Sequence, residues 1–139
     1  MNRIVAIVQA RMSSSRLPKK VLLPLGTRTV LGQVFNQLSF ARRLNGSVLA
    51  TSVDTSDDPI EEWARRSGIR CVRGSLEDVL DRYYRAAKEV HAGVVVRITA
   101  DCPLIDPGIV DLVVERYLEG GFDYVSNTHP PAFPDGQDV

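Results

Sequence analysis

Short apolar segments alternate with helical patterns along the whole chain, and this alternation limits the folds open to it. The apolar segments are rich in β-branched residues, above all "VVVRIT" and "SVLATS", which favours strands. Strands that alternate with helices are typical of βαβ units. We therefore predict an α/β fold with a mainly parallel sheet and helices on both faces. The predicted strands are residues 3–8, 47–52, 69–72, 94–99 and 122–126, and the predicted helices are residues 29–44, 59–67, 76–91 and 107–118.

Three of these helices carry start signals. Asp58 and Asp106 each precede a proline, which is the pattern of an N-cap followed by proline at the first helical position. Ser75 and Asp78 resemble a weak capping box, in which two side chains satisfy free N–H groups at the helix start. We expect Asp58, Asp106 and Ser75 to be the three N-caps.

Length and hydropathy predict one domain over residues 1–139. The last stretch, "NTHPPAFPDGQDV", is rich in proline and has no pattern of its own, so we expect the domain to be truncated at its C-terminal end; a frayed tail is the alternative. No apolar run approaches the ~18 residues that a membrane span needs. The first residues lack the pattern of a secretory signal. We therefore expect a cytoplasmic protein that does not bind membranes.

The charged residues are distributed unevenly, although the formal net charge is zero. Residues 1–53 contain eight Lys or Arg and no acid, whereas residues 98–139 contain eight acids and one Arg. A cationic half beside an acidic half suits a site that handles both an anionic ligand and a metal cation.

The segment "QARMSSSRLPKK" follows the first predicted strand, and ligand sites in α/β sheets form at the carboxyl ends of the strands. Its serine hydroxyls, including those of Ser13 and Ser14, can donate to phosphate oxygens. Arg11 and Arg16 can bind phosphate through two N–H groups, and Lys20 supplies a point charge. The segment lacks the GxxxxGK[ST] pattern of a P-loop. A solvated basic loop or a nucleic-acid contact remains the alternative.

Two further segments fall at the same predicted edge. Asp101 follows the strand of residues 94–99, where one carboxylate can hold Mg²⁺ together with substrate phosphates; the alternative is a turn residue that caps the loop. Gly74 lies in a short loop where a ligand could approach the backbone. Arg82 lies further along the same segment, either at the site or on a solvated helix face.

Five ordered motifs carry a resemblance to a known family: "VQARMSSSRLPKKVL", "LATSVDTSDDPI", "RGSLEDVLDRYYRAAK", "VRITADCPLIDP" and "DYVSN…PDGQDV". Together they resemble the N-terminal part of the cytidylyltransferases that activate acidic sugars, the CMP-sialate and CMP-Kdo synthetase superfamily. The likeness is greatest to the branch of the spore coat polysaccharide biosynthesis protein F. It runs from Ile4 to the last residue.

This resemblance implies a Rossmann-like fold of the glycosyltransferase-A kind. It also implies transfer of CMP from CTP to a sugar, with release of pyrophosphate, dependence on Mg²⁺ and a homodimer. Matching of the motifs assigns catalytic roles to Arg16, Lys20 and Asp101, with Asp101 as the metal ligand. The residues assigned to nucleotide binding are Ala10, Arg11, Ser13, Ser14, Thr51, Ser52, Arg73, Gly74, Asp81, Arg82, Thr99 and Ala100.

The resemblance leaves some points open. It names no acceptor sugar, and it gives no role to Asp135 or Asp138. Two other functions remain as alternatives. One is a glycosyltransferase that consumes a nucleotide sugar, although "ADCP" lacks the second acid of the Asp-x-Asp motif common in such enzymes. The other is a non-catalytic module that binds phosphate polymers, which the acidic second half disfavours; we expect no nucleic-acid partner.

Overall fold

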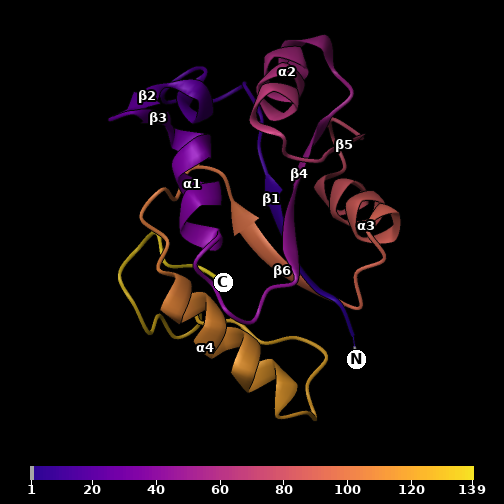
Figure 1. Cartoon of the computed structure of the whole chain (residues 1–139), viewed down its shortest axis with the longest axis vertical. Helices are drawn as coiled ribbons and strands as arrows, with labels where there is room; N and C mark the ends of the chain where they lie inside the picture. The colour runs from indigo at the N-terminus through magenta and orange to yellow at the C-terminus, as the bar shows by residue number, and fades with distance from the viewer. Residues whose placement is uncertain (1) are drawn as a thin grey trace.

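The computed structural model describes residues 2–139 and contains a four-stranded sheet with the order β5-β4-β1-β6. All three strand pairs are parallel, as predicted (Figure 1). The strands are β1 (Ile4–Gln9), β4 (Gly46–Ser52), β5 (Cys71–Gly74) and β6 (Val94–Thr99). The helices are α1 (Val30–Leu38), α2 (Asp58–Ser67), α3 (Val79–Glu89) and α4 (Pro107–Leu118).

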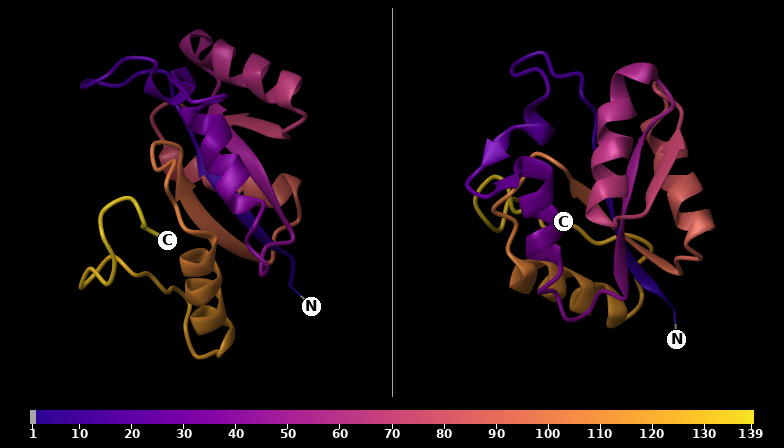
Figure 2. Two further views of the ribbon diagram at one scale, coloured as in Figure 1. Left: turned by 60° about the vertical axis from the view of Figure 1, so that its left-hand side comes forward. Right: turned by 45° about the horizontal axis from the view of Figure 1, so that its top comes forward.

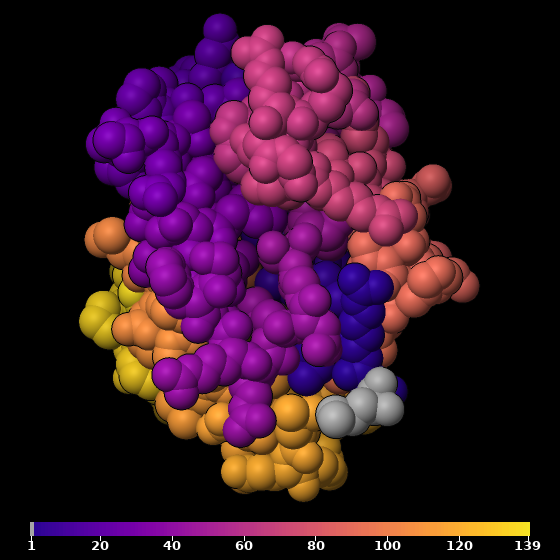
Figure 3. Space-filling view, viewed as in Figure 1, coloured from indigo at the N-terminus to yellow at the C-terminus, as the bar shows by residue number. Residues whose placement is uncertain are grey.

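Helices cover both faces of the sheet, which confirms the predicted architecture. Alternate residues of β1 point to opposite faces because side chains alternate along a strand. Ile4, Ala6 and Val8 pack with α1, α2 and α4, whereas Val5 and Ile7 pack with α3. Figure 2 shows this arrangement from two further directions. In the space-filling view, atoms of α1 and α2 (purple to pink) cover much of the face turned to the viewer (Figure 3).

Smaller elements lie in the loops that follow β1 and β4. After β1 come the 3₁₀ helix η1 (Lys20–Leu22) and a two-stranded antiparallel hairpin of β2 (Pro24–Leu25) and β3 (Arg28–Thr29). After β4 comes the 3₁₀ helix η2 (Thr55–Asp57). The alternation of strands and helices did not predict any of them, because each is shorter than one period of a helical pattern.

The predicted strand at residues 122–126 is wrong. This segment has no strand or helix and bends at Asp123, and Phe122 and Tyr124 are exposed. A β-rich pattern becomes a strand only where its backbone groups find a ladder partner. Within residues 2–139, β6 is the edge strand on this side, and the segment runs alongside it without joining the sheet.

Two predicted N-caps are also wrong. Asp57, not Asp58, precedes α2, and Asp78, not Ser75, caps α3 by accepting from the backbone N–H of Asp81 at 3.0 Å. Asp106 caps α4 as predicted and accepts from the N–H of Gly108.

Two predicted helix ends need correction as well. The predicted helix at 29–44 is shorter and ends at Leu38. After it the chain turns toward α4, where the N–H groups of Arg42 and Arg43 donate to the Asp111 carboxylate. The helix expected at 76–91 begins only at Val79, because Asp78 is its cap.

Candidate nucleotide site

A basic hollow of about 450 Å³ lies at the carboxyl ends of β1 and β6. The two strands are neighbours in the sheet, so the loops that follow them meet there. Ten of the fifteen predicted site residues line this hollow: Ala10, Arg11, Ser13, Ser14, Arg16, Lys20, Arg82, Thr99, Ala100 and Asp101. The structure therefore brings the basic loop and Asp101 together, as their positions after the two strands predicted.

Lys20 and Asp101 form an ion pair at the wall of this hollow. The Lys20 Nζ lies 3.3 Å from the Asp101 Oδ2, although 81 residues separate them along the chain. Partial burial alone would raise the pKa of the Asp101 carboxyl. Hydrogen bonds from Lys20 and Thr99 and the charge of Lys20 outweigh burial, so the pKa of Asp101 is lowered and the carboxylate stays ionised at neutral pH.

Arg82 is a buried cation in the wall of the hollow. Its side chain is 1% exposed, and its Nε and Nη1 have no hydrogen-bond partner within residues 2–139. Burial lowers the pKa of this guanidinium, the nearby Asp57 charge acts to raise it, and Arg11 lowers it again. Buried donors without partners cost free energy. An anion bound in the hollow would accept hydrogen bonds from these two donors.

Gly74 lets Arg82 reach this position. A Cβ at residue 74 would lie 3.1 Å from the Arg82 Cγ and 3.3 Å from the Arg82 Cα. A side chain there would push the guanidinium or the first turns of α3 away from the sheet. Gly74 is buried and does not line the hollow. The group that approaches its backbone is therefore the Arg82 side chain and not a ligand in the hollow.

Four other predicted residues also lie outside the hollow. Thr51 and Ser52 are fully buried at the end of β4, where the Thr51 hydroxyl donates to the carbonyl of Ala10 at 2.8 Å. Arg73 points away and pairs with carboxylates of α2, 2.8 Å from Asp58 and 2.7 Å from Glu61.

Asp81 is the fourth of these residues. It pairs with Arg85 on the same helix at 2.7 Å and accepts from the N–H of Ser75. The hydrogen bond from Arg85, helped by the bond from Ser75 and by the charge of Arg85, lowers the pKa of Asp81 more than burial raises it.

The sequence analysis missed several residues that line the hollow: Gln9, Ser15, Val21, Val79 and Arg97. Arg97 had a detectable signal. It is the one charged residue in "VVVRIT", and β-strand alternation places it on the α3 face of the sheet. There its guanidinium lies 5.5 Å from the centre of the Tyr83 ring.

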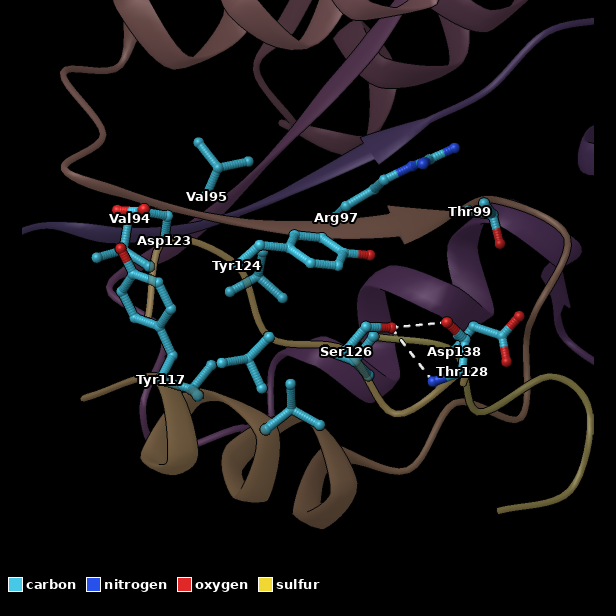
Figure 4. Close-up of a pocket in the computed structure, with 15 residues that line it drawn as sticks. Val94, Val95, Arg97, Thr99, Tyr117, Asp123, Tyr124, Ser126, Thr128 and Asp138 are labelled. Carbon is cyan, nitrogen blue, oxygen red and sulfur yellow. Dashed lines mark hydrogen bonds between the residues drawn. The ribbon is translucent and has the colours of Figure 1, made fainter. Parts of the chain in front are cut away.

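A second hollow of about 290 Å³ lies between β6, α4 and the C-terminal segment (Figure 4). Its walls include valines of β6 and α4, together with Tyr117 and Tyr124. Asp138, next to the last residue, also lines the second hollow. Arg97 and Thr99 line both this hollow and the basic one. The two hollows are therefore neighbours along β6.

Within residues 2–139, no three His, Cys, Asp or Glu side chains gather closely enough to hold a metal by themselves. None of the described helices has the length and apolar character to cross a membrane.

Comparison with known proteins identifies the family. Residues 5–135 match the cytidylyltransferase family. The chain belongs to the cytidylyltransferase family. It is 36% identical, over 135 residues, to the spore coat polysaccharide biosynthesis protein SpsF of Bacillus subtilis; the match covers 94% of this chain and 56% of SpsF.

Solved structures of cytidylyltransferases have the same fold. A cytidylyltransferase from Leptospira borgpetersenii is 37% identical and superposes with a TM-score of 0.91, covering 99% of this chain and 59% of that one. The structure of a CMP-2-keto-3-deoxy-manno-octonic acid synthetase complexed with CTP gives a TM-score of 0.72 at 22% identity, covering 95% of this chain and 50% of that one. The Rossmann-like fold predicted from the sequence is thus confirmed.

This cytidylyltransferase-family chain spans about half the length of the curated relatives it matches.

Proposed function

We propose that the protein transfers CMP from CTP to a sugar, with release of pyrophosphate, for the synthesis of a cell-surface or spore-coat polysaccharide. The observation that carries this proposal is the buried Arg82 guanidinium, two of whose donors have no partner within residues 2–139. It lies in one hollow with Arg11, Arg16 and Lys20 and with the Asp101 carboxylate. Such a group of cations around one hollow suits a triphosphate. The SpsF-like branch suggests the sugar polymer.

Nine of the predicted residues that line the hollow would bind the nucleotide. Arg11, Arg16 and Lys20 hold the triphosphate, together with the hydroxyls of Ser13 and Ser14. Ala10, Thr99 and Ala100 form the backbone wall beside the base and ribose, and Arg82 completes the cation shell. We propose that Thr51, Ser52 and Gly74 support this wall from behind. Arg73 and Asp81 stay predicted neighbours of the nucleotide.

The residues present fit a magnesium ion. Mg²⁺ takes one or two carboxylates together with substrate phosphates and waters, and Asp101 offers one ionised carboxylate, 48% exposed, at the rim of the phosphate cradle. Bound there, Mg²⁺ would supply Lewis-acid stabilisation of phosphate charge. Asp101 would hold it, and Lys20 would exchange its present ion pair for contact with the triphosphate.

In this reaction the protein positions the two substrates and neutralises the charge on the phosphates. A sugar oxygen attacks the α-phosphorus in line, and the bond to the leaving pyrophosphate breaks. Arg16 and Lys20 stabilise the negative charge that develops on the pyrophosphate. Donors of this kind contribute about 3 kcal/mol each, which corresponds to roughly a hundredfold in rate.

The identity of the product tests this proposal. The complete gene product, supplied with CTP and a panel of sugars, is expected to release one pyrophosphate for each CMP-sugar formed. A glycosyltransferase would instead release a nucleoside diphosphate from a nucleotide sugar and no pyrophosphate from CTP, and that result would overturn the proposal. A cytoplasmic location stays a prediction from the sequence pattern, and a homodimer stays a prediction from the resemblance.

A further inference from the structure

Asp57 is a buried carboxylate that has no role in any of the assignments above. It is 1% exposed and sits at the N-cap position of α2, yet its side chain makes no capping hydrogen bond. An aspartate at this position normally accepts from the first N–H groups of its helix. Here the carboxylate turns away from the helix, so its contacts elsewhere must compensate for the missing cap.

Those contacts lead to the start of the basic loop. Asp57 Oδ1 accepts from the backbone N–H of Met12 at 2.7 Å, across 45 residues. Its Oδ2 accepts from the hydroxyl of Ser52, at the end of β4. Met12 is itself buried and lies between Arg11 and Ser13, which both line the hollow. The carboxylate thus connects the cradle to a rigid strand of the sheet.

Other hydrogen bonds hold the same turn of chain from different sides. The Ala10 carbonyl accepts from the Thr51 hydroxyl, and the Met12 carbonyl accepts from the N–H of Lys19 at 3.0 Å. The second of these closes the loop on itself, so it fixes the shape of the loop but not its place on the sheet. The Asp57 carboxylate, in contrast, accepts from the backbone N–H of Met12 and ties the loop to the sheet.

Asp57 does not line the hollow, so it would act on a ligand only through other residues. Its negative charge is also the one that most supports the protonated form of Arg82. Loss of that charge alone would make the hollow more positive and would favour anions.

We propose that Asp57 is a positioning residue of the phosphate cradle, which holds Arg11 and Ser13 in place through the N–H of Met12. The ligand class is a polyphosphate, and in this respect the proposal rests on the proposed function. The hydrogen bond to Met12 carries the effect, because an aspartate charge without this contact would weaken anion binding.

Two substitutions separate the hydrogen bond from the charge. Asp57→Asn and Asp57→Ala both remove one negative charge, but only asparagine keeps an oxygen that can accept from Met12. Binding of inorganic tripolyphosphate and of CTP, each with Mg²⁺, is measured by titration calorimetry on the 139-residue chain. We expect Asp57→Asn to bind at least as tightly as the wild type and Asp57→Ala to bind about tenfold or more weakly, the loss expected for one such hydrogen bond.

Asp58→Asn is the matched control. Asp58 is the next residue and is exposed, and its partner is Arg73, outside the hollow. This variant is expected to bind both probes within about twofold of the wild type, as is typical for an exposed charge. If Asp57→Ala and Asp57→Asn bind alike, the charge and not the hydrogen bond accounts for the effect, and the proposal is wrong.

Amide exchange gives a local readout that does not depend on the ligand. In the folded wild type the Met12 N–H is expected to exchange at least about tenfold more slowly than the neighbouring N–H of Ser13, and to keep this protection in Asp57→Asn. A Met12 N–H that exchanges freely in the folded wild type would overturn the proposal, even if Asp57→Ala fails to fold. Protection of Met12 in a chain that binds neither probe would contradict the proposed function and leave the holding role of Asp57 supported.

Discussion

Replacement of Arg82 by methionine is expected to stabilise the fold and to weaken the binding of triphosphate strongly. The guanidinium is 1% exposed and two of its donors have no partner within residues 2–139. Methionine keeps the aliphatic stem that packs on Gly74 and removes the buried charge. Burial of a charge whose donors lack partners costs free energy, so its removal is expected to stabilise the fold by about 1 kcal/mol, which corresponds to a rise of about 2–8 °C in Tm.

The same substitution removes the N–H donors that would form hydrogen bonds to a bound anion. Hydrogen bonds to charged groups contribute about 1.5–3 kcal/mol each, so the affinity for CTP with Mg²⁺ is expected to fall at least about fiftyfold. Opposite signs for stability and affinity are the mark of a residue kept for its ligand. Thermal unfolding and calorimetric titration of the variant measure the two quantities.

Arg85→Met is the control for this experiment. Arg85 lies one turn from Arg82 on α3, is exposed, and pairs with Asp81. Its loss is expected to leave Tm and CTP affinity nearly unchanged. Destabilisation of Arg82→Met with normal CTP affinity would show that the guanidinium serves the fold and not a ligand.

The second large effect is expected from Arg16→Ala in the complete gene product. Arg16 is exposed and lines the hollow, so its removal leaves the core intact while it removes stabilisation of the leaving pyrophosphate. The rate of pyrophosphate release at saturating CTP is expected to fall by about a hundredfold. Steady-state kinetics with the preferred sugar provide the measurement.

Lys19→Ala is the matched control, because Lys19 belongs to the same basic loop but is exposed and does not line the hollow. Its turnover is expected to stay within about threefold of the wild type, as for other exposed charges. Equal losses in both variants would indicate a general effect of positive charge. A loss below about threefold in Arg16→Ala would remove this residue from the catalytic set.

The layered fold could be predicted from the sequence because its main strands are short apolar runs between helical patterns; β1 is buried on both sides and β6 on one. Residues 3–8 and 94–99 are nearly continuous apolar runs, and each coincides within a residue or so with an observed strand. Residues 122–126 carry the same kind of signal but remain irregular, since strand formation depends on a partner that the segment itself does not contain. The length of α1 could not be predicted for a similar reason: its end depends on hydrogen bonds to Asp111, far along the chain.

The residues at the centre of the candidate site could be predicted, but the buried residues that support them could not. Lys20 and Asp101 each follow a predicted strand of a parallel sheet, and this was sufficient to place both at one edge of the sheet. Arg82 was expected either at the nucleotide or on a solvated face, and only packing against Gly74 decides between these. Asp57 was missed because "SDDPI" has the pattern of a simple helix start, and no local pattern shows that a side chain reaches Met12.

Titration of the chain with CTP, UTP, ATP and GTP, each with and without Mg²⁺, tests the central claim most directly. The account predicts that CTP with Mg²⁺ binds at least about tenfold more tightly than any other combination, a difference of about 1.4 kcal/mol. Weak binding of all four nucleotides alike, independent of Mg²⁺ and falling steeply as salt is added, is the behaviour of a general polyanion site. That result would contradict the claim that the basic hollow is the CTP site of a cytidylyltransferase.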